Sequence, residues 1–212
     1  MFLVPLHSRA VGSLQLHPEE ESLLSPKVSA KRRNGFILGR AAARLALRRA
    51  GCAYSPAILQ GPDREPLWPA GFAGSITHCG EWAVAAVAAQ RRVRAIGIDL
   101  EDVDAVQRGE IAETVCSEAE LKWVADTKDS PQKLAMIFSA KESIYKALNP
   151  LCHRFFDFHD VELAWSPQRA RFEGTLRVDL ERDFPAGFQI QAGCQTWQNL
   201  IFTHALIAAP TI

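Results

Sequence analysis

The segment Ala95–Glu101, A-I-G-I-D-L-E, constrains the fold most, because apolar and acidic side chains alternate along it. A repeat of two residues predicts a β-strand with an apolar face and a polar face. Asp99 and Glu101 would share the face opposite the isoleucine and leucine side chains. Gly97, which has no side chain, would let another element or a ligand approach the strand closely.

The two acids of this strand are candidate metal ligands. Two residues along a strand separate α-carbons by about 6.5–7 Å, so the carboxylates of Asp99 and Glu101 can converge on one cation. Two carboxylates that leave positions open for water and phosphate suit Mg²⁺, and Mn²⁺ could replace it. The alternative is an edge strand whose acids face solvent, and the D-x-E pattern alone favours that alternative.

A second pattern lies in the predicted helix Gln132–Leu148, which we expect to end before Pro150. Lys141 interrupts the apolar stripe of this helix, and a buried charge must be paired. Glu142 follows it, and Lys146 lies four residues after Glu142. These residues could supply a third carboxylate for the metal and two ammonium groups for a polyphosphate. A solvated Glu–Lys pair that stabilises the helix is the alternative.

The segment G-S-I-T-H-C-G at residues 74–80 predicts a turn between two short strands, Ser75–Thr77 and Trp82–Ala89. His78 in that turn could donate to a phosphate oxygen or act as a base, with help from the Thr77 hydroxyl. A histidine that bonds only to nearby backbone is the alternative.

Arginines gather on the first predicted helix, Arg32–Arg49, which should stop at Gly51. The Pro- and Gly-rich loop 54–74 adds Arg64, and we expect Trp68 to anchor this loop. Arginine side chains bind phosphate monoesters well, although a solvated helix face is the simpler interpretation of any one of them. The arginines that line a face away from the apolar stripe are Arg33, Arg40, Arg44 and Arg48.

The rest of the chain combines helical and strand patterns. Residues 102–116 are polar, and Ser117 and Glu120 form a capping-box motif that opens a helix through Trp123. Residues 155–210 indicate several strands, of which Leu200–Ala208 is the last. Each half therefore offers a long helix and a group of strands, which predicts an α+β fold with halves at residues 1–101 and 102–212.

Composition narrows the functional classes. Apolar residues make up 48% of the 212 residues and charged residues 23%, as in globular proteins. Lys plus Arg equals Asp plus Glu at 24 each, so net charge gives no reason to expect nucleic acid as a partner. Five cysteines without a CxxC motif favour a reducing compartment. With no signal peptide and no long apolar run, we expect a cytoplasmic protein without a membrane span.

Taken in order, the motifs resemble those of 4′-phosphopantetheinyl transferases of the surfactin-transferase type. The pattern is G-I-D-x-E followed, about forty residues later, by [FW]-S-x-K-E-[AS]-x-x-K, and it is complete from Gly97 to Lys146. The upstream segments R-R-N-G-F-x-x-G-R, R-E-P-L-W-P and G-S-I-T-H-C resemble the branch of enterobactin synthetase component D. The resemblance covers about residues 30 to 160.

The resemblance implies a pseudo-dimeric fold of two similar α/β halves with the site between them. It also implies roles for individual residues. Mg²⁺ would be held by Asp99, Glu101 and Glu142. Glu142 and Lys146 would be catalytic. Lys141 and Lys146 would neutralise the coenzyme A pyrophosphate. The remaining coenzyme A contacts would come from Arg32, Arg40, Arg64, Glu65, Pro66, Thr77 and His78.

The implied reaction is attack of a carrier-protein serine on the β-phosphorus of coenzyme A, with release of 3′,5′-ADP. Glu142 or a metal-bound water would take the serine proton. The acyl, peptidyl or aryl carrier would dock near residues 102–116 and the helix after Ser117, on a monomeric enzyme. Its pathway could be siderophore, peptide, polyketide or fatty-acid synthesis. The alternatives are another Mg²⁺-dependent phosphoryl-transfer enzyme and a non-catalytic module that binds coenzyme A or a carrier.

Overall fold

The computed structural model describes residues 1–126 and 129–210. The chain forms two compact units, one of residues Met1–Ile96 with the chain from Ala208 onward, the other of Gly97–Ile207. Each unit contains a long helix and an antiparallel sheet, which confirms the predicted α+β class with two α/β halves. Among the described residues, no helix is long and apolar enough to cross a membrane.

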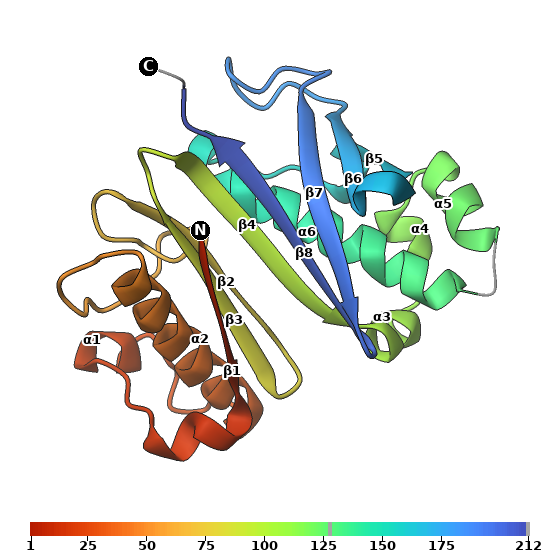
Figure 1. Ribbon diagram of the computed structural model, residues 1–212. Helices are drawn as coiled ribbons and strands as arrows, with labels where there is room; N and C mark the ends of the chain where they lie inside the picture. Colours follow the sequence, from red (N-terminus) through yellow and green to blue (C-terminus); the bar gives the residue numbers. More distant parts are fainter. Residues whose placement is uncertain (127–128, 211–212) are drawn as a thin grey trace. The chain divides into compact units, whose positions relative to one another are not determined.

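The first unit packs one long helix against three strands (Figure 1). The sheet has the order β1-β3-β2, with both neighbouring pairs antiparallel. Alanines and Leu47 of the helix meet Val4 and Val87 of the sheet in a buried core. The elements are β1 (Phe2–His7), η1 (Ser8–Ser13), α1 (Pro18–Glu21), α2 (Ala30–Arg49), β2 (Phe72–Cys79) and β3 (Trp82–Ala89).

The long helix α2 begins two residues before the predicted start, because the Ser29 side chain caps it by accepting from the Arg32 N–H. The strand β2 is longer than predicted. It continues through His78, which pairs with Ala83 across the hairpin, and the turn follows at Gly80. The prediction that His78 lies in the turn is therefore wrong.

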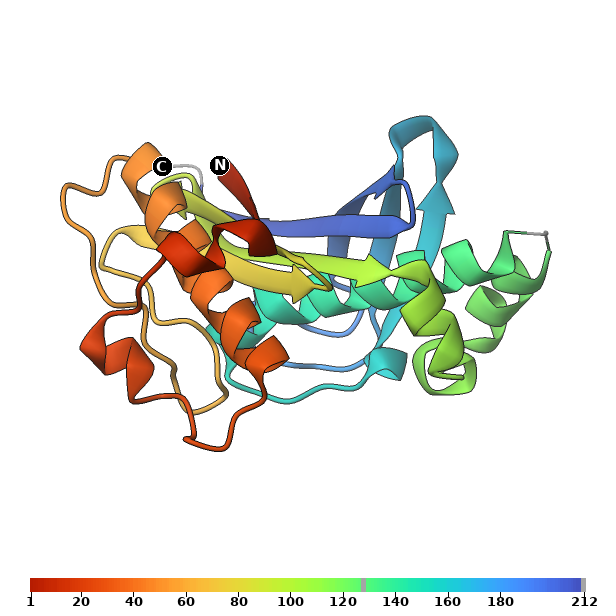
Figure 2. The ribbon, with the colours of Figure 1, turned by 90° about the horizontal axis from the view of Figure 1, so that it is seen from below.

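The second unit contains most of a five-stranded sheet with the order β4-β8-β7-β6-β5. The helix α6 runs across one face of this sheet (Figures 1 and 2). The strands are β4 (Val93–Asp102), β5 (Val161–Ser166), β6 (Arg171–Leu176), β7 (Gln189–Trp197) and β8 (Leu200–Ala208). The helices are α3 (Val103–Arg108), α4 (Ala112–Val115), α5 (Glu118–Ala125), α6 (Ser130–Cys152), η2 (Phe158–Asp160) and η3 (Pro167–Arg169).

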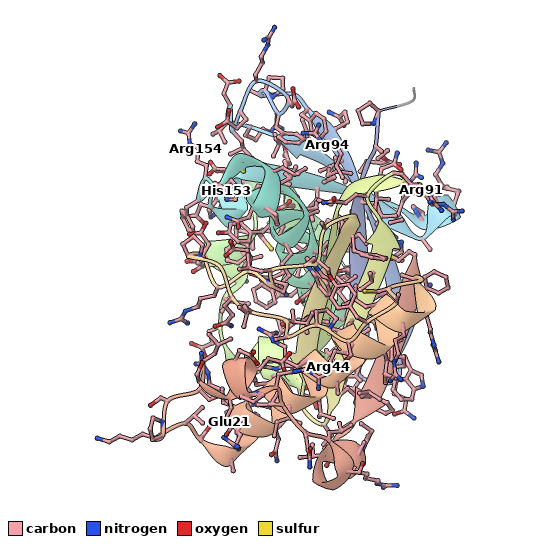
Figure 3. All side chains as sticks on the ribbon, turned by 90° about the vertical axis from the view of Figure 1, so that its left-hand side faces the viewer. Glu21, Arg44, Arg91, Arg94, His153 and Arg154 are labelled. Atoms are coloured by element: carbon pink, nitrogen blue, oxygen red, sulfur yellow. The ribbon has the colours of Figure 1, made fainter. Side chains whose placement is uncertain are left out.

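Helix α6 continues past Pro150, so the predicted end before that residue is wrong. A proline removes one N–H donor, and this loss falls in the last turn of the helix. The chain then reverses at His153, whose left-handed backbone (φ 46°) lets its N–H bond to the Asn149 carbonyl (His153 is labelled in Figure 3).

The expected division of the chain falls after Glu101, whereas the compact units divide between Ile96 and Gly97. Because of this difference, Asp99 and Glu101 belong to the same compact unit as α6. The assignment of functions to the two halves stays a prediction.

Candidate active site

The acids of β4 face helix α6. A side chain at Gly97 would make its Cβ overlap the Ser143 carbonyl oxygen, so α6 rests directly on the strand at this residue. Since side chains alternate along a strand, Asp99 and Glu101 lie on the same face as Gly97. Asp99 is only 2% exposed. The strand β4 does lie at the edge of the five-stranded sheet, but its acids are not turned to solvent, so that part of the alternative is wrong. The expected close approach at Gly97 is confirmed.

Four charged side chains converge where β4 meets α6. The Lys146 ammonium donates to Asp99 Oδ1 at 2.5 Å and lies 3.9 Å from Glu142 Oε2. Glu101, on the same face of β4 as Asp99, is half-buried. Two carboxylates therefore lie within 4 Å of one ammonium group, and a third interacts with it electrostatically, in a partly desolvated place. The alternative of a freely solvated Glu–Lys pair on the helix does not fit this arrangement.

The electrostatics of the four residues show an excess of negative charge. Burial, and then the neighbouring Asp99, raise the pKa of Glu101 to about 8. Burial also raises the pKa of Glu142, although Lys146 opposes the rise. Burial lowers the pKa of Lys146, but the surrounding carboxylates outweigh burial and raise it overall. Additional positive charge would relieve this crowding.

The donor set fits a hard divalent cation. Among the described residues, no three His, Cys, Asp or Glu side chains are grouped so that they could hold a metal ion by themselves. Mg²⁺ does not need such a group, because it keeps several waters and is bound by one or two carboxylates together with substrate phosphates. Asp99, Glu101 and Glu142 supply only carboxylate oxygens, which are the ligands that Mg²⁺ prefers.

Lys141 does not join this group. Its ammonium donates to the Glu120 carboxylate at 2.7 Å, the Val115 carbonyl at 2.8 Å and the Phe158 carbonyl at 2.9 Å. An ammonium has three donors, so all of them are used, and the residue is only 2% exposed. The structure therefore leaves no donor of Lys141 free for a pyrophosphate, and the predicted neutralisation of that group by Lys141 stays a prediction. The sequence pattern identifies the capping box at Glu120 but not its lysine partner.

An aromatic cavity of about 270 Å³ adjoins Glu142. Tyr145 lies one turn further along α6 and contacts the rings of Phe155 and Phe156. Phe155 is 77% exposed, which is unusual for so large an apolar side chain. The sequence motifs do not include these residues. Their sequence signal is the pair of phenylalanines directly after the long helix.

In the first unit, β2 lies close to α2 because two helix positions are glycine. The His78 ring lies over Gly35, where an added Cβ would be 3.4 Å from it, and Ile76 lies over Gly39. Arg32 is exposed one turn before Gly35 on the same face of the helix. The structure therefore brings together His78 and the start of the arginine-rich helix. Thr77, the neighbouring predicted residue, is buried.

Arg40 is a buried cation whose donors are only partly satisfied. It is 5% exposed, and its Nε and Nη2 atoms have no hydrogen-bond partner among the described residues. Its guanidinium lies 4.3 Å from the centre of the Phe36 ring. Burial lowers the pKa of Arg40 to about 10, with Glu20 opposing and Arg44 reinforcing the shift. A buried charged donor without a partner is costly, so this position fits an anionic ligand.

The predicted loop residues Arg64, Glu65 and Pro66 lie in a tight turn. The Gly61 N–H bonds to the Glu65 carbonyl, and the Glu65 carboxylate folds over Gly61 and accepts from the Asp63 N–H. Arg64 is exposed and has a left-handed backbone (φ 65°), a strained conformation for a residue with a side chain. Trp68, the expected anchor, packs on Gly74 of β2. This contact ties the turn to the strand that carries His78.

Comparison with known proteins identifies the class. Residues 19–88 match the 4′-phosphopantetheinyl transferase N-terminal domain, and residues 95–192 match the 4′-phosphopantetheinyl transferase superfamily. The chain belongs to the 4′-phosphopantetheinyl transferase superfamily. The predicted family and enzyme class are thereby confirmed.

Relatives from several bacteria share this class. The chain is 38% identical over 152 residues to the 4′-phosphopantetheinyl transferase Npt of Nocardia iowensis. This match covers 72% of this chain and 67% of Npt. It is 33% identical over 201 residues to the 4′-phosphopantetheinyl transferase Svp of Streptomyces mobaraensis, and the match covers 92% of this chain and 80% of Svp. It is also 42% identical over 119 residues to enterobactin synthase component D of Escherichia coli K12, covering 55% of each chain. These similarities support the predicted enterobactin-type branch.

Proposed function

We propose that the protein transfers the 4′-phosphopantetheine arm of coenzyme A to a carrier-protein serine, and that Asp99, Glu142 and Lys146 perform the chemistry. The observation that carries the proposal is the convergence of three carboxylates on one ammonium group, at the junction of β4 and α6. Such a group suits a polyphosphate with a bound divalent cation. Mg²⁺ would be held by Asp99, Glu101 and Glu142 and would supply charge neutralisation at the pyrophosphate.

The reaction is a displacement at phosphorus. The serine oxygen forms a bond to the β-phosphorus, the bond from that phosphorus to the bridging oxygen breaks, and 3′,5′-ADP leaves with the bridging oxygen. Glu142 takes the serine proton, since it is a carboxylate next to the ammonium group of Lys146 and beside the aromatic cavity. Lys146 stabilises the charge that develops on the phosphate oxygens. Asp99 orients Lys146 through their hydrogen bond.

The aromatic cavity beside Glu142 suits the rest of the arm. The pantetheine chain is flexible and uncharged, with methyl and methylene groups between two amides, and the cavity is lined by Tyr145, Phe155 and Phe156 next to the proposed base. Burial of the methyl and methylene groups against aromatic rings is favourable. In this arrangement the cavity positions the arm while the acids and Lys146 act on its phosphate.

The residues that we expect to contact the nucleotide end lie on α2, on β2 and in the loop between them. Arg40 offers buried, unpartnered donors that suit the dianionic 3′-phosphate, and Arg32 is exposed on the same helix. His78, beside Gly35, adds a donor for a phosphate oxygen. The strained turn with Arg64, Glu65 and Pro66 contacts the adenine side. Carriers of siderophore, peptide or polyketide synthesis are the acceptors that we expect, for a monomeric enzyme in the cytoplasm.

The direct test is the intact mass of an apo carrier protein after incubation with the enzyme, coenzyme A and Mg²⁺. We expect a gain of one phosphopantetheine unit, which is lost with EDTA and in Glu142→Gln. Normal turnover of Glu142→Gln would exclude Glu142 as the base. Release of 3′,5′-ADP without any carrier would instead favour a hydrolase. Binding of coenzyme A without transfer to carriers of several classes would favour a binding module.

A further inference from the structure

Glu120 is a buried carboxylate held by several donors inside the protein. It occupies the third position of α5 and is 2% exposed. One oxygen accepts from the Ser117 N–H at 2.7 Å and from the Lys141 ammonium at 2.7 Å. The other accepts from the Leu163 N–H at 2.7 Å. A buried carboxylate with this many donors is a fixed structural element.

Lys141 binds this carboxylate and the carbonyls of two further segments. Through the carbonyls of Val115 and Phe158 it binds the end of α4 and the turn η2, and through Glu120 it binds the start of α5. Leu163 lies in β5, so the network also reaches the sheet. One ammonium therefore holds α6 at a fixed rotation against the segments that surround it.

The first unit contains the same arrangement with different residues. Glu20, which is fully buried, occupies the third position of α1 and accepts from the His17 N–H at 3.0 Å. It also accepts from Arg44 of α2 at 2.6 Å and from the Ile58 N–H at 2.8 Å (Arg44 is labelled in Figure 3). In each unit, the glutamate of a short helix pairs with a cation of the following long helix.

The presence of a cation–glutamate pair in both units indicates the role of Lys141 and Arg44. Arg44 is followed by Leu45, whereas Lys141 is followed by Glu142. The cation–glutamate pair thus exists in a unit where no reactive acid follows the cation. Supporting the long helix is the property common to both pairs, and contact with a pyrophosphate is not required for either.

We propose that Lys141 is a positioning residue for phosphopantetheinyl transfer, which acts through Glu120 to fix the direction of the neighbouring Glu142, and that its ammonium does not contact the pyrophosphate. The proposal rests on the proposed function of Glu142. Because Glu142 follows Lys141 in the same turn of α6, a rotation of the helix would move its carboxylate away from Asp99 and Lys146. A displacement of about 1 Å can cost roughly 10²-fold in rate.

The test separates positioning from substrate binding by steady-state kinetics of the full chain. In Lys141→Met the Glu120 carboxylate loses its partner, so we expect the melting temperature to fall by roughly 6 to 20 °C. Below the new midpoint, kcat should fall by roughly 10²-fold while KM for coenzyme A stays unchanged. Lys146→Met is the contrast, since it should raise KM as well.

The double variant Glu120→Gln/Lys141→Met provides the rescue. The side-chain amide that replaces the Glu120 carboxylate can accept from the Leu163 N–H and donate to a carbonyl that the lysine leaves. The Ser117 N–H loses its acceptor, but the double variant has no buried unpaired charge. We expect it to recover most of the melting temperature and of kcat. A pyrophosphate ligand could not be rescued by changing Glu120.

Three results would overturn the proposal. They are a raised KM for coenzyme A in Lys141→Met at an unchanged melting temperature, a double variant as slow as the single one, and a normal kcat in folded Lys141→Met. Failure of the proposed function looks different. In that case the unmodified chain transfers nothing to any carrier, while the recovery of melting temperature in the double variant remains measurable.

Discussion

The Lys146 ammonium bonds to Asp99 across 2.5 Å and thereby joins helix α6 to strand β4. Glu142 approaches the same ammonium to 3.9 Å from one turn earlier on the helix. The contact places a cation between acids that would otherwise repel one another. The ion pair needs both residues, so replacement of either Lys146 or Asp99 should remove it.

Replacement of Lys146 by Met should lower kcat for transfer by roughly 10²- to 10³-fold, because the phosphate oxygens lose a charge that stabilises the transition state. Lys133→Met is the matched control on the same helix, since Lys133 donates to the Trp123 carbonyl and lies over the Trp123 ring. Carrier modification followed by mass spectrometry measures both. Equal losses of kcat in the two variants would contradict a specific role for Lys146.

The raised pKa of Glu101 predicts how the stability of the metal-free protein depends on pH. Its pKa is about 8 in the folded protein and about 4.5 ordinarily, so between these values the folded state holds a proton that the unfolded chain has released. The contribution of Glu101 to stability therefore falls as pH rises from about 4.5 to about 8. Melting temperatures in EDTA should show this slope, and Glu101→Gln should remove it.

The same melting experiment with added Mg²⁺ is the control. Because Mg²⁺ competes with the proton on Glu101, Mg²⁺ should raise the melting temperature of the unmodified protein more at about pH 8 than at about pH 5.5. The difference between the unmodified protein and Glu101→Gln isolates this residue from other titrating groups. Identical pH slopes for the two proteins in EDTA would argue against a crowded carboxylate at residue 101.

Arg40 and Arg44 make a matched pair on α2. Arg40→Met removes buried donors without partners, so stability should hold or rise, while KM for coenzyme A should increase about 10- to 100-fold. Arg44→Met leaves Glu20 unpaired and should lower the melting temperature instead. With 3′-dephospho-coenzyme A, Arg40→Met and the unmodified protein should differ little. A large difference with that substrate would place Arg40 away from the 3′-phosphate.

Gly97→Ala should be strongly destabilising, by about 3 kcal/mol or more, because the new Cβ would overlap the Ser143 carbonyl of α6. If the new Cβ pushes α6 away from β4, the hydrogen bond between Lys146 and Asp99 should break, and the rate of phosphopantetheine transfer should fall. Gly12→Ala is the control, since a Cβ there meets nothing within 4 Å. Thermal unfolding and carrier modification measure the two effects, and a Gly97→Ala protein with the stability of the control would refute the close contact.

Local pattern is enough to predict the elements that build the acidic group. The alternation at Ala95–Glu101 predicts a strand with both acids on one face, and the structure confirms it within a strand from Val93 to Asp102. The capping box at Ser117 and Glu120 also forms as predicted. These features depend on neighbours in sequence, which periodicity and capping rules describe directly.

Long-range partners are the part that local pattern does not provide. Lys141 is predicted as a charge on an apolar face, but its partner Glu120 lies 21 residues away and only the fold brings them together. The position of His78 differs from the prediction because hairpin pairing with Ala83 extends the strand beyond its apolar residues. Local rules favour a helix end before Pro150, whereas aromatic contacts between Tyr145 and Phe156 favour one more turn of α6.

The residue that follows each glutamate-paired cation differs between the two long helices. Lys141 is succeeded by an acid and Arg44 by Leu45, so only one of the two pairs is followed by a carboxylate. With Glu142 as the proposed base, we expect one reactive centre in each chain, although the support is duplicated. Titration with 3′,5′-ADP should accordingly saturate at one molar equivalent.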